Sequence, residues 1–265
     1  MGARHNGLVL DDTPAWIQRA AGALRPSPGR SRPASTVPWD WTDIALFFAV
    51  FLTGWLLISA LALSPAVQSW GDSLLRGVPT AERTAVGSLT LQTAVYVMGL
   101  AVILVLALGR RHGRLADLGW RWPRWWWLPL GVVAAAASYE MLTLISDVLQ
   151  ALFPQVTNGQ IPEVQGEYGT YVGFAIPAVS VVAPIVEETF FRGFVYGWMR
   201  RQLNVPAASV LSGIFFALLH FQPIIVLPLA VLGVGLALLY EYSGSLLPGM
   251  IVHALFNLVE IVSIV

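Results

Sequence analysis

The sequence predicts an all-α fold, a polytopic transmembrane helical bundle of about seven spans. Hydrophobic residues make up 56% of the 265 residues, charged residues make up only 11%, and the mean hydropathy is +0.68. A soluble domain carries about twice that charged share. The apolar residues also gather in runs of about 20, which is the length that a helix needs to cross the hydrocarbon core of a bilayer.

Seven apolar runs are candidates for these spans. In chain order they are residues 44–63, 89–108, 127–149, 172–199, 207–220, 224–240 and 246–264. The fifth and sixth runs are short, and only Phe221, Gln222 and Pro223 separate them. They fit tilted, broken or re-entrant helices, which are tolerated where the backbone lines a cavity enclosed by protein.

The N-terminal stretch, residues 1–40, is polar and rich in Pro, Arg and Ser, so we expect a partly disordered cytoplasmic tail. Residues 11–14 (Asp-Asp-Thr-Pro) would also cap a short interfacial helix, and the sequence leaves both interpretations open. The stretch lacks the pattern of a cleavable signal peptide, so the first run is expected to stay as an anchor. We divide the remainder into three spans with their connections, residues 41–170, and a C-terminal transmembrane core, residues 171–265.

Arginine supplies all 15 cationic side chains, and its placement predicts the orientation. Cytoplasmic connections of membrane proteins carry an excess of basic residues. Five arginines lie in the tail, five lie in the connection 109–126, and Arg200 and Arg201 follow the fourth run. The connection after the third run has Glu163 and Glu167 but no Arg, and the two arginines between the first two runs are outnumbered. We therefore expect a multi-pass protein of the cell membrane with a cytoplasmic N-terminus.

Polar side chains occur inside three of the last four runs. They are Glu187, Glu188 and Arg192 in the fourth, His220 in the fifth, and His253 and Asn257 in the seventh. An acidic residue at the centre of a membrane helix costs roughly 2.5–3.5 kcal/mol on insertion scales, so it is normally kept for a function or a partner. The spacing of four predicts that Glu188 pairs with Arg192 and that His253 and Asn257 share a face. Glu187 points elsewhere and has no partner on its own helix.

These residue types fit hydrolysis by an activated water. The chain has no Cys, and no Ser is paired with a base at a recognisable spacing, so covalent catalysis is disfavoured. Glu187 would take a proton from the water, while a histidine and Asn257 stabilise the developing oxyanion. Alternatively, His220, His253 and a glutamate such as Glu187 would hold a zinc ion that activates the water. The sequence leaves both mechanisms open.

Glu-Glu-x-x-x-Arg, Phe-x-x-x-His and His-x-x-x-Asn, in this order on apolar helices, resemble the motifs of the CAAX prenyl protease and bacteriocin-processing (CPBP, or Abi) family of intramembrane endopeptidases. The resemblance covers about residues 172–265. It implies catalytic roles for Glu187, His220, His253 and Asn257, and it makes Glu188 and Arg192 supporting members of the catalytic group. It also implies cleavage of a membrane-associated or lipidated protein or peptide.

The expected partners are therefore the lipid bilayer and that substrate, and no nucleic acid. We expect a glutamate-type protease without a cofactor, whose site lies in a cavity open to the cytoplasm. Zinc dependence remains the alternative, because family members have been described in both ways. A transporter with a proton pathway is a further alternative, although no internal repeat supports it. So is an immunity module that does not cleave peptides.

Overall fold

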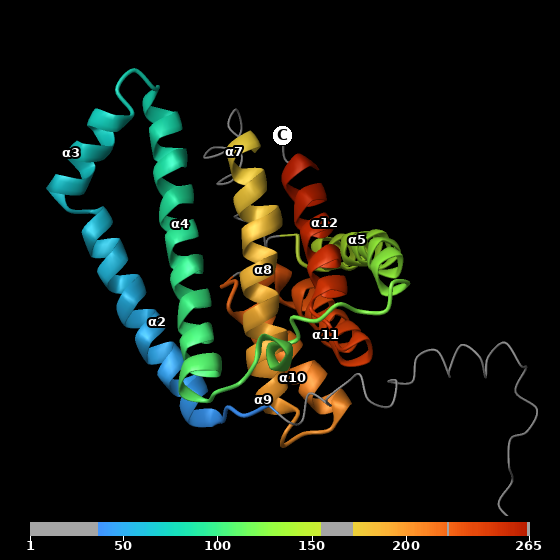
Figure 1. Cartoon of the computed structure of the whole chain (residues 1–265). Helices are drawn as coiled ribbons and strands as arrows, with labels where there is room; N and C mark the ends of the chain where they lie inside the picture. Colours follow the sequence, from blue (N-terminus) through green and yellow to red (C-terminus); the bar gives the residue numbers. More distant parts are fainter. Residues whose placement is uncertain (1–36, 155–171, 222, 264–265) are drawn as a thin grey trace, which may run out of the picture. The chain divides into compact units, whose positions relative to one another are not determined.

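The computed structural model describes residues 37–154, 172–221 and 223–263, all within one compact unit, Arg32–Val265 (Figure 1). Every regular element in these described ranges is a helix, as the sequence predicted. Among the described residues, four helices are long and apolar enough to cross a membrane, and two shorter ones are also apolar. Most of the predicted tail, including its possible short helix, lies outside the described residues.

The first three described helices form an up-and-down group that is coloured blue to green in Figure 1. Helix α2 spans Trp41–Ala62, α3 spans Pro65–Leu74, and α4 spans Thr80–Leu104 and continues as the π-helix η2, Val105–Arg110. Helix α3 was not predicted, because it is too short and polar for a span. Ser64, whose side chain caps it, and Pro65 at its first turn are the local signals that mark its start.

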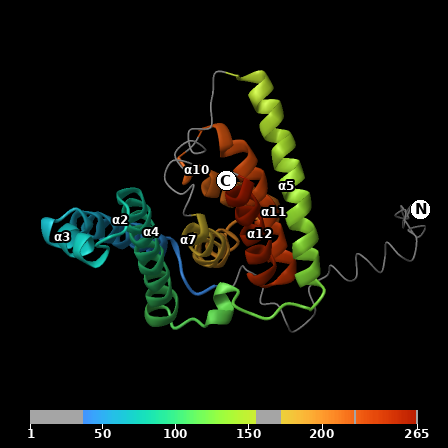
Figure 2. The same ribbon diagram turned by 90° about the horizontal axis from the view of Figure 1, so that it is seen from above.

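The helices from the arginine-rich connection onward pack against one another in a second group. They include the 3₁₀ turn η3 (Leu115–Leu118), α5 (Trp127–Leu152), α10 (Val205–Leu218), the 3₁₀ turn η7 (Pro223–Ile225), α11 (Val226–Ser243) and α12 (Leu247–Ser263). Figure 1 shows α5 nearly end-on and α7–α8 (Val172–Pro177 and Ala183–Glu188) from the side, whereas Figure 2 shows α5 from the side and α7 nearly end-on. Helix α5 therefore runs across the direction of α7–α8, a relation that hydropathy alone does not reveal.

The fourth predicted run forms one series of helical segments that alternates between two registers. It consists of α7 (Val172–Pro177), the π-helix η5 (Ala178–Val182), α8 (Ala183–Glu188), the π-helix η6 (Thr189–Tyr196) and α9 (Gly197–Met199). We call this series the broken helix. A π-helix bonds each N–H to the carbonyl five residues back, and such segments are frequent at functional sites. Here the two π segments flank α8, which ends with the glutamate pair.

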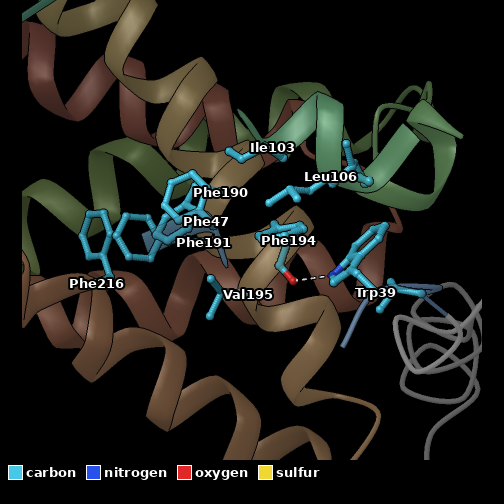
Figure 3. Close-up of a cluster of buried hydrophobic side chains, with 12 residues drawn as sticks. Trp39, Phe47, Ile103, Leu106, Phe190, Phe191, Phe194, Val195 and Phe216 are labelled. Atoms are coloured by element: carbon cyan, nitrogen blue, oxygen red, sulfur yellow. Dashed lines mark hydrogen bonds between the residues drawn. The ribbon is translucent and has the colours of Figure 1, made fainter. Parts of the chain in front are cut away.

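The largest buried apolar cluster surrounds η6 (Figure 3). Its buried members come from the residues just before α2, from α2, the end of α4, η2, η3, η6 and α10: Val37, Trp39, Phe47, Ile103, Leu106, Ala107, Leu118, Phe190, Phe191, Phe194, Val195 and Phe216. Trp39 is fully buried and donates its indole N–H to the carbonyl of Phe194 at 2.7 Å. Because buried aromatic side chains supply much of a core's packing energy, this cluster holds η6 between the two groups of helices.

Helices α10 and α11 approach until their backbones touch. A Cβ atom on Gly213 would lie 2.7 Å from the carbonyl oxygen of Ala230, and one on Gly233 would lie 2.7 Å from the Cα of Gly213. Real Cβ atoms essentially never come this close, so no larger residue fits at either position without a shift. Small residues permit such close packing of membrane helices, and here they leave the Gly233 carbonyl within reach of Arg192.

Four charged residues tie the start of α2 to the end of η2, and we call them the aspartate–arginine clamp. Asp43, whose side chain is 0% exposed, pairs with Arg110 at 3.1 Å and with Arg111 at 2.7 Å. Asp40 caps α2 and pairs with Arg111 at 2.6 Å. Two of the arginines that predicted the orientation are therefore also structural.

Candidate active site

The predicted pair of Glu188 and Arg192 forms and is fully buried. An Arg192 Nη1 hydrogen is donated to Glu188 Oε1 at 2.9 Å, and the two side chains are 0% and 1% exposed. His253 Nδ1 lies 2.9 Å from the same oxygen. Because a carboxylate that is paired with an arginine only accepts, the Nδ1 atom of His253 carries the hydrogen of this bond. Glu188 therefore orients the imidazole.

Glu187 also faces His253, from the other side of the ring. Its Oε1 accepts a hydrogen bond from the Tyr96 hydroxyl at 2.6 Å, and its Oε2 lies 3.7 Å from His253 Nε2. Oε2 is buried and has no hydrogen-bond partner among the described residues. The sequence predicted only that Glu187 has no partner on its own helix, and the structure adds that α4 and α12 each bring a polar group to it. We call Glu187, Glu188, Arg192 and His253 the glutamate–histidine cluster.

The buried guanidinium of Arg192 is held on several sides. Its Nη2 donates to the carbonyl of Gly233 at 3.2 Å, at the point where α10 and α11 touch. Its central carbon lies 4.7 Å from the centre of the Phe216 ring and 5.7 Å from that of Phe191. Cation–π contacts of this kind contribute about 2 kcal/mol when they are desolvated. These contacts hold the guanidinium, which keeps its proton in proteins, beside Glu188.

His220 stands next to the cluster but does not join it. Its Nδ1 lies 2.8 Å from the carbonyl of Phe216, so Nδ1 donates and Nε2 is left open. The Phe216 ring lies edge-on to His220 at 4.7 Å and to His253 at 5.6 Å between ring centres. Within the part of the chain that the structure describes, His220 makes no hydrogen bond or ion pair with Glu187, Glu188 or His253. A shared phenyl ring is what links the two histidines.

Asn257 lies one turn beyond His253 on α12 and bonds elsewhere. Its Nδ2 donates to the carbonyl of Val179 in η5 at 2.9 Å. The sequence suggested that this amide helps to stabilise the developing oxyanion. In the structure it contacts the backbone of the broken helix, and Glu188 is the residue that orients the imidazole.

The set proposed for zinc does not assemble. Across residues 37–154, 172–221 and 223–263, no three His, Cys, Asp or Glu side chains are grouped so that they would hold a metal ion. Of the three expected ligands, Glu187 and His253 face each other, while His220 turns toward the Phe216 carbonyl. The residues as arranged therefore do not fit a zinc site.

Two site residues carried too little sequence signal to be found. Tyr96 lies in the second apolar run, where only its hydroxyl distinguishes it from the surrounding core residues. Gly249 lies where α12 approaches the cluster, and a Cβ atom there would be 3.1 Å from Glu188 Oε2. A glycine on an apolar helix is compatible with many packing roles, so neither position could be assigned to the site from the sequence.

Residues 170–259 match the family model described as Rce1-like: type II CAAX prenyl endopeptidase Rce1-like. Over this segment the chain is similar to the CAAX prenyl endopeptidases. The match confirms the family resemblance inferred from the motifs. The search of curated proteins and the search of solved structures each found no match.

The Rce1-like segment is roughly the C-terminal third of the chain and includes all six predicted site residues. Together with the apolar helices, the match indicates a multi-pass membrane protein and an intramembrane endopeptidase of the CAAX type. Tyr96 and the aspartate–arginine clamp lie outside the segment. One contact of Glu187 is therefore supplied by a helix that the family match does not cover.

Proposed function

We propose that this protein hydrolyses a peptide bond of a membrane-associated or lipidated protein or peptide, using a water that Glu187 and His253 activate. The reaction takes place in a cavity open to the cytoplasm, where the N-terminus also lies. One observation carries the proposal. A single imidazole stands between two carboxylates, of which Glu188 is 1% exposed and Glu187 is 15% exposed, and only Glu188 is paired with an arginine.

The charges of the glutamate–histidine cluster imply that one proton can move between its side chains. Two carboxylates stand beside one permanent cation, Arg192, so the cluster is neutral when it binds one further proton, and we assign that proton to His253, which then has a hydrogen on both nitrogens. Buried charges are tolerated when they are matched. In the neutral state Glu187 is an ionised base, and His253 Nε2 is a hydrogen donor that faces it.

The chemistry follows from these two groups. Glu187 Oε2 takes one proton from a water molecule as the water oxygen bonds to the peptide carbonyl carbon. His253 Nε2 donates a hydrogen bond to the resulting oxyanion. Glu187 then gives its proton to the leaving nitrogen as the C–N bond breaks. Atoms and charges balance, and the cluster returns to its starting state.

Each remaining group keeps the two acting groups in place. Glu188 and Arg192 hold His253 by its Nδ1, as the carboxylate of a hydrolytic triad holds its histidine. Tyr96 occupies Glu187 Oε1, which leaves Oε2 as the oxygen that works as a base. The substrate is a peptide close to the membrane, because the helices that carry these groups are apolar.

Purified protein reconstituted in lipid nanodiscs tests the proposal directly. The substrate is a library of fluorogenic peptides, each supplied with and without a lipid anchor. The wild type is expected to cleave some members, and Glu187→Gln is expected to cleave none. Cleavage by both proteins would remove Glu187 from the mechanism. Failure of the folded wild type to cleave any member would favour a non-proteolytic function.

A further inference from the structure

A backbone carbonyl in the broken helix has lost its helical partner. In η5 the N–H of Ala183 donates to the carbonyl of Ala178, five residues back. By the same register, the N–H of residue 184 would meet the carbonyl of Val179. Residue 184 is a proline, which has no N–H. Because an unpaired backbone group in an apolar environment is costly, the Val179 carbonyl needs another donor.

Asn257 supplies that donor from another helix. Its Nδ2 lies 2.9 Å from the Val179 oxygen. Asn257 therefore takes the place of the missing N–H at Pro184. The bond joins α12 to η5 immediately before α8, the segment that carries the glutamate pair.

Helix α12 thus holds the broken helix at two points, on either side of Pro184. Asn257 bonds to Val179 before the proline, and His253, one turn away, bonds to Glu188 after it. Two hydrogen bonds from one face of α12 fix both the rotation of the segment between Val179 and Glu188 and its position along the helix axis. Since the second attachment is the bond that orients His253, a shift at the first would also misplace the imidazole.

We propose that Asn257 is a positioning residue: it replaces the hydrogen bond that Pro184 cannot make and so sets the register between α12 and the glutamate pair. Its effect on catalysis rests on the proposed function, but its effect on the fold does not. An amide that instead binds the substrate oxyanion would act independently of residue 184. The two roles therefore differ in how they depend on that residue.

Thermal unfolding in detergent tests the inference without a substrate. Four proteins are compared: the wild type, Asn257→Leu, Pro184→Ala and the double variant. Asn257→Leu removes the donor and is expected to lower the melting temperature. Pro184→Ala restores an N–H that can reach the Val179 carbonyl, so in that background the same substitution should cause less than half the loss. An equal loss in both backgrounds would overturn the proposal.

A matched control separates this coupling from a general change in stability. Leu255→Ala alters another side chain of α12, which packs on α5 and α11, and its loss should be the same with Pro or Ala at 184. If Pro184→Ala does not fold, Asn257→Asp takes its place, because it keeps the size but cannot donate. Asn257→Asp should then melt as early as Asn257→Leu. Wild-type melting of Asn257→Asp would contradict the inference.

Cleavage of a library peptide that the wild type accepts gives the second measurement. Loss of one such hydrogen bond predicts about a tenfold lower turnover for Asn257→Leu. Pro184→Ala should restore most of that loss, which it would not do for an oxyanion donor. A wild type that cleaves no peptide would refute the proposed function, while the melting temperatures would still decide the role of Asn257.

Discussion

The aspartate–arginine clamp and the glutamate–histidine cluster are built from similar side chains but differ in their charges. The clamp sets two carboxylates against two guanidinium groups. The cluster sets two carboxylates against one guanidinium and one imidazole. Arginine does not release its proton in proteins, whereas an imidazole exchanges one readily. The clamp therefore keeps a fixed set of charges, and the cluster retains one movable proton.

This difference separates a structural group from a chemical one. In the clamp, hydrogen bonds from the Thr42 side chain and backbone, together with Arg111, lower the pKa of Asp40 to about 2. Its charge therefore stays constant over the neutral range. In the cluster, the side chain that completes the charge balance is the one that faces the unpaired oxygen of Glu187. The clamp has as many arginines as carboxylates, whereas the cluster has one arginine fewer than carboxylates, so proton transfer is possible in the cluster.

Removing the base should have the largest effect. Glu187→Gln keeps the shape and still accepts the Tyr96 hydrogen bond, but it cannot take a proton. Cleavage of a library peptide is expected to fall by about 100- to 10,000-fold, the usual contribution of a general base. The melting temperature in detergent should stay near that of the wild type. Glu140→Gln, an exposed site on α5, is the matched control and should cleave normally.

Unbalancing the buried pair should mainly affect stability. Arg192→Ala leaves Glu188 without its cation, and Glu188→Ala leaves the guanidinium without its anion. Removing one partner of a buried pair costs about 3–5 kcal/mol, and removing both costs less. Melting temperatures should therefore drop strongly in each single variant and recover partly in the double variant. Two single variants that melt like the wild type would show that the pair does not stabilise the fold.

Loss of the Tyr96 hydroxyl should have a smaller effect on the rate alone. Tyr96→Phe removes the hydrogen bond that fixes Glu187, and bonds to charged groups contribute about 1.5–3 kcal/mol. We expect kcat to fall about tenfold or more, with KM little changed, because the base is misplaced while substrate binding is intact. Tyr139→Phe, on α5, is the control, since Tyr139 contacts Phe256 through its ring. A change in KM alone would contradict a role in positioning Glu187.

The clamp should respond to acid but not to changes near neutral pH. The pKa of Asp40 is lowered from 3.8 to about 2 in the folded protein, so its contribution to stability is complete above about pH 4 and is lost as the pH falls toward 2. The difference in melting temperature between the wild type and Asp40→Asn should be constant from about pH 5 to about pH 8. Below about pH 4 the difference should shrink. A difference that grew in acid would show that the carboxylate does not stabilise the clamp in its charged form.

Chelation should have the smallest effect. We expect peptide cleavage to survive prolonged exposure to a strong zinc chelator, because the candidate ligands Glu187, His220 and His253 do not converge. Cleavage is measured before and after chelation and again after adding zinc. Loss of activity that stoichiometric zinc restores, with about one zinc bound per chain, would identify a metalloprotease and make both histidines ligands.

Local spacing predicted the parts of the site that depend on one helix. Glu188 and Arg192 pair because four residues bring them onto one face. The apolar runs became helices close to their expected bounds, except the second run, whose helix begins at Thr80 and not near residue 89. The order of the motifs also pointed to the family that the segment matches. These features are encoded within a few turns of chain, so no tertiary information was needed to find them.

Contacts between distant helices were beyond such reasoning. The bond from Tyr96 to Glu187 joins residues 91 positions apart, and that from Asn257 to Val179 joins residues 78 apart. No sequence motif links either residue of these pairs to its partner. The change to a π register is equally hidden, since Pro184 shows where an N–H is missing but not which side chain replaces it. Helix crossing, as for α5, depends on packing that hydropathy does not encode.

The two π segments also make the number of residues in the broken helix important. A π turn holds one residue more than an α turn, and each residue of an α-helix turns the chain by about 100°. Deleting one residue from 178–182 would let that stretch become α-helical without breaking the helix. It would also rotate Glu187 and Glu188 away from α12, which holds His253. An insertion or deletion here is therefore as consequential as a substitution, and a gap placed in this stretch changes which side chains meet.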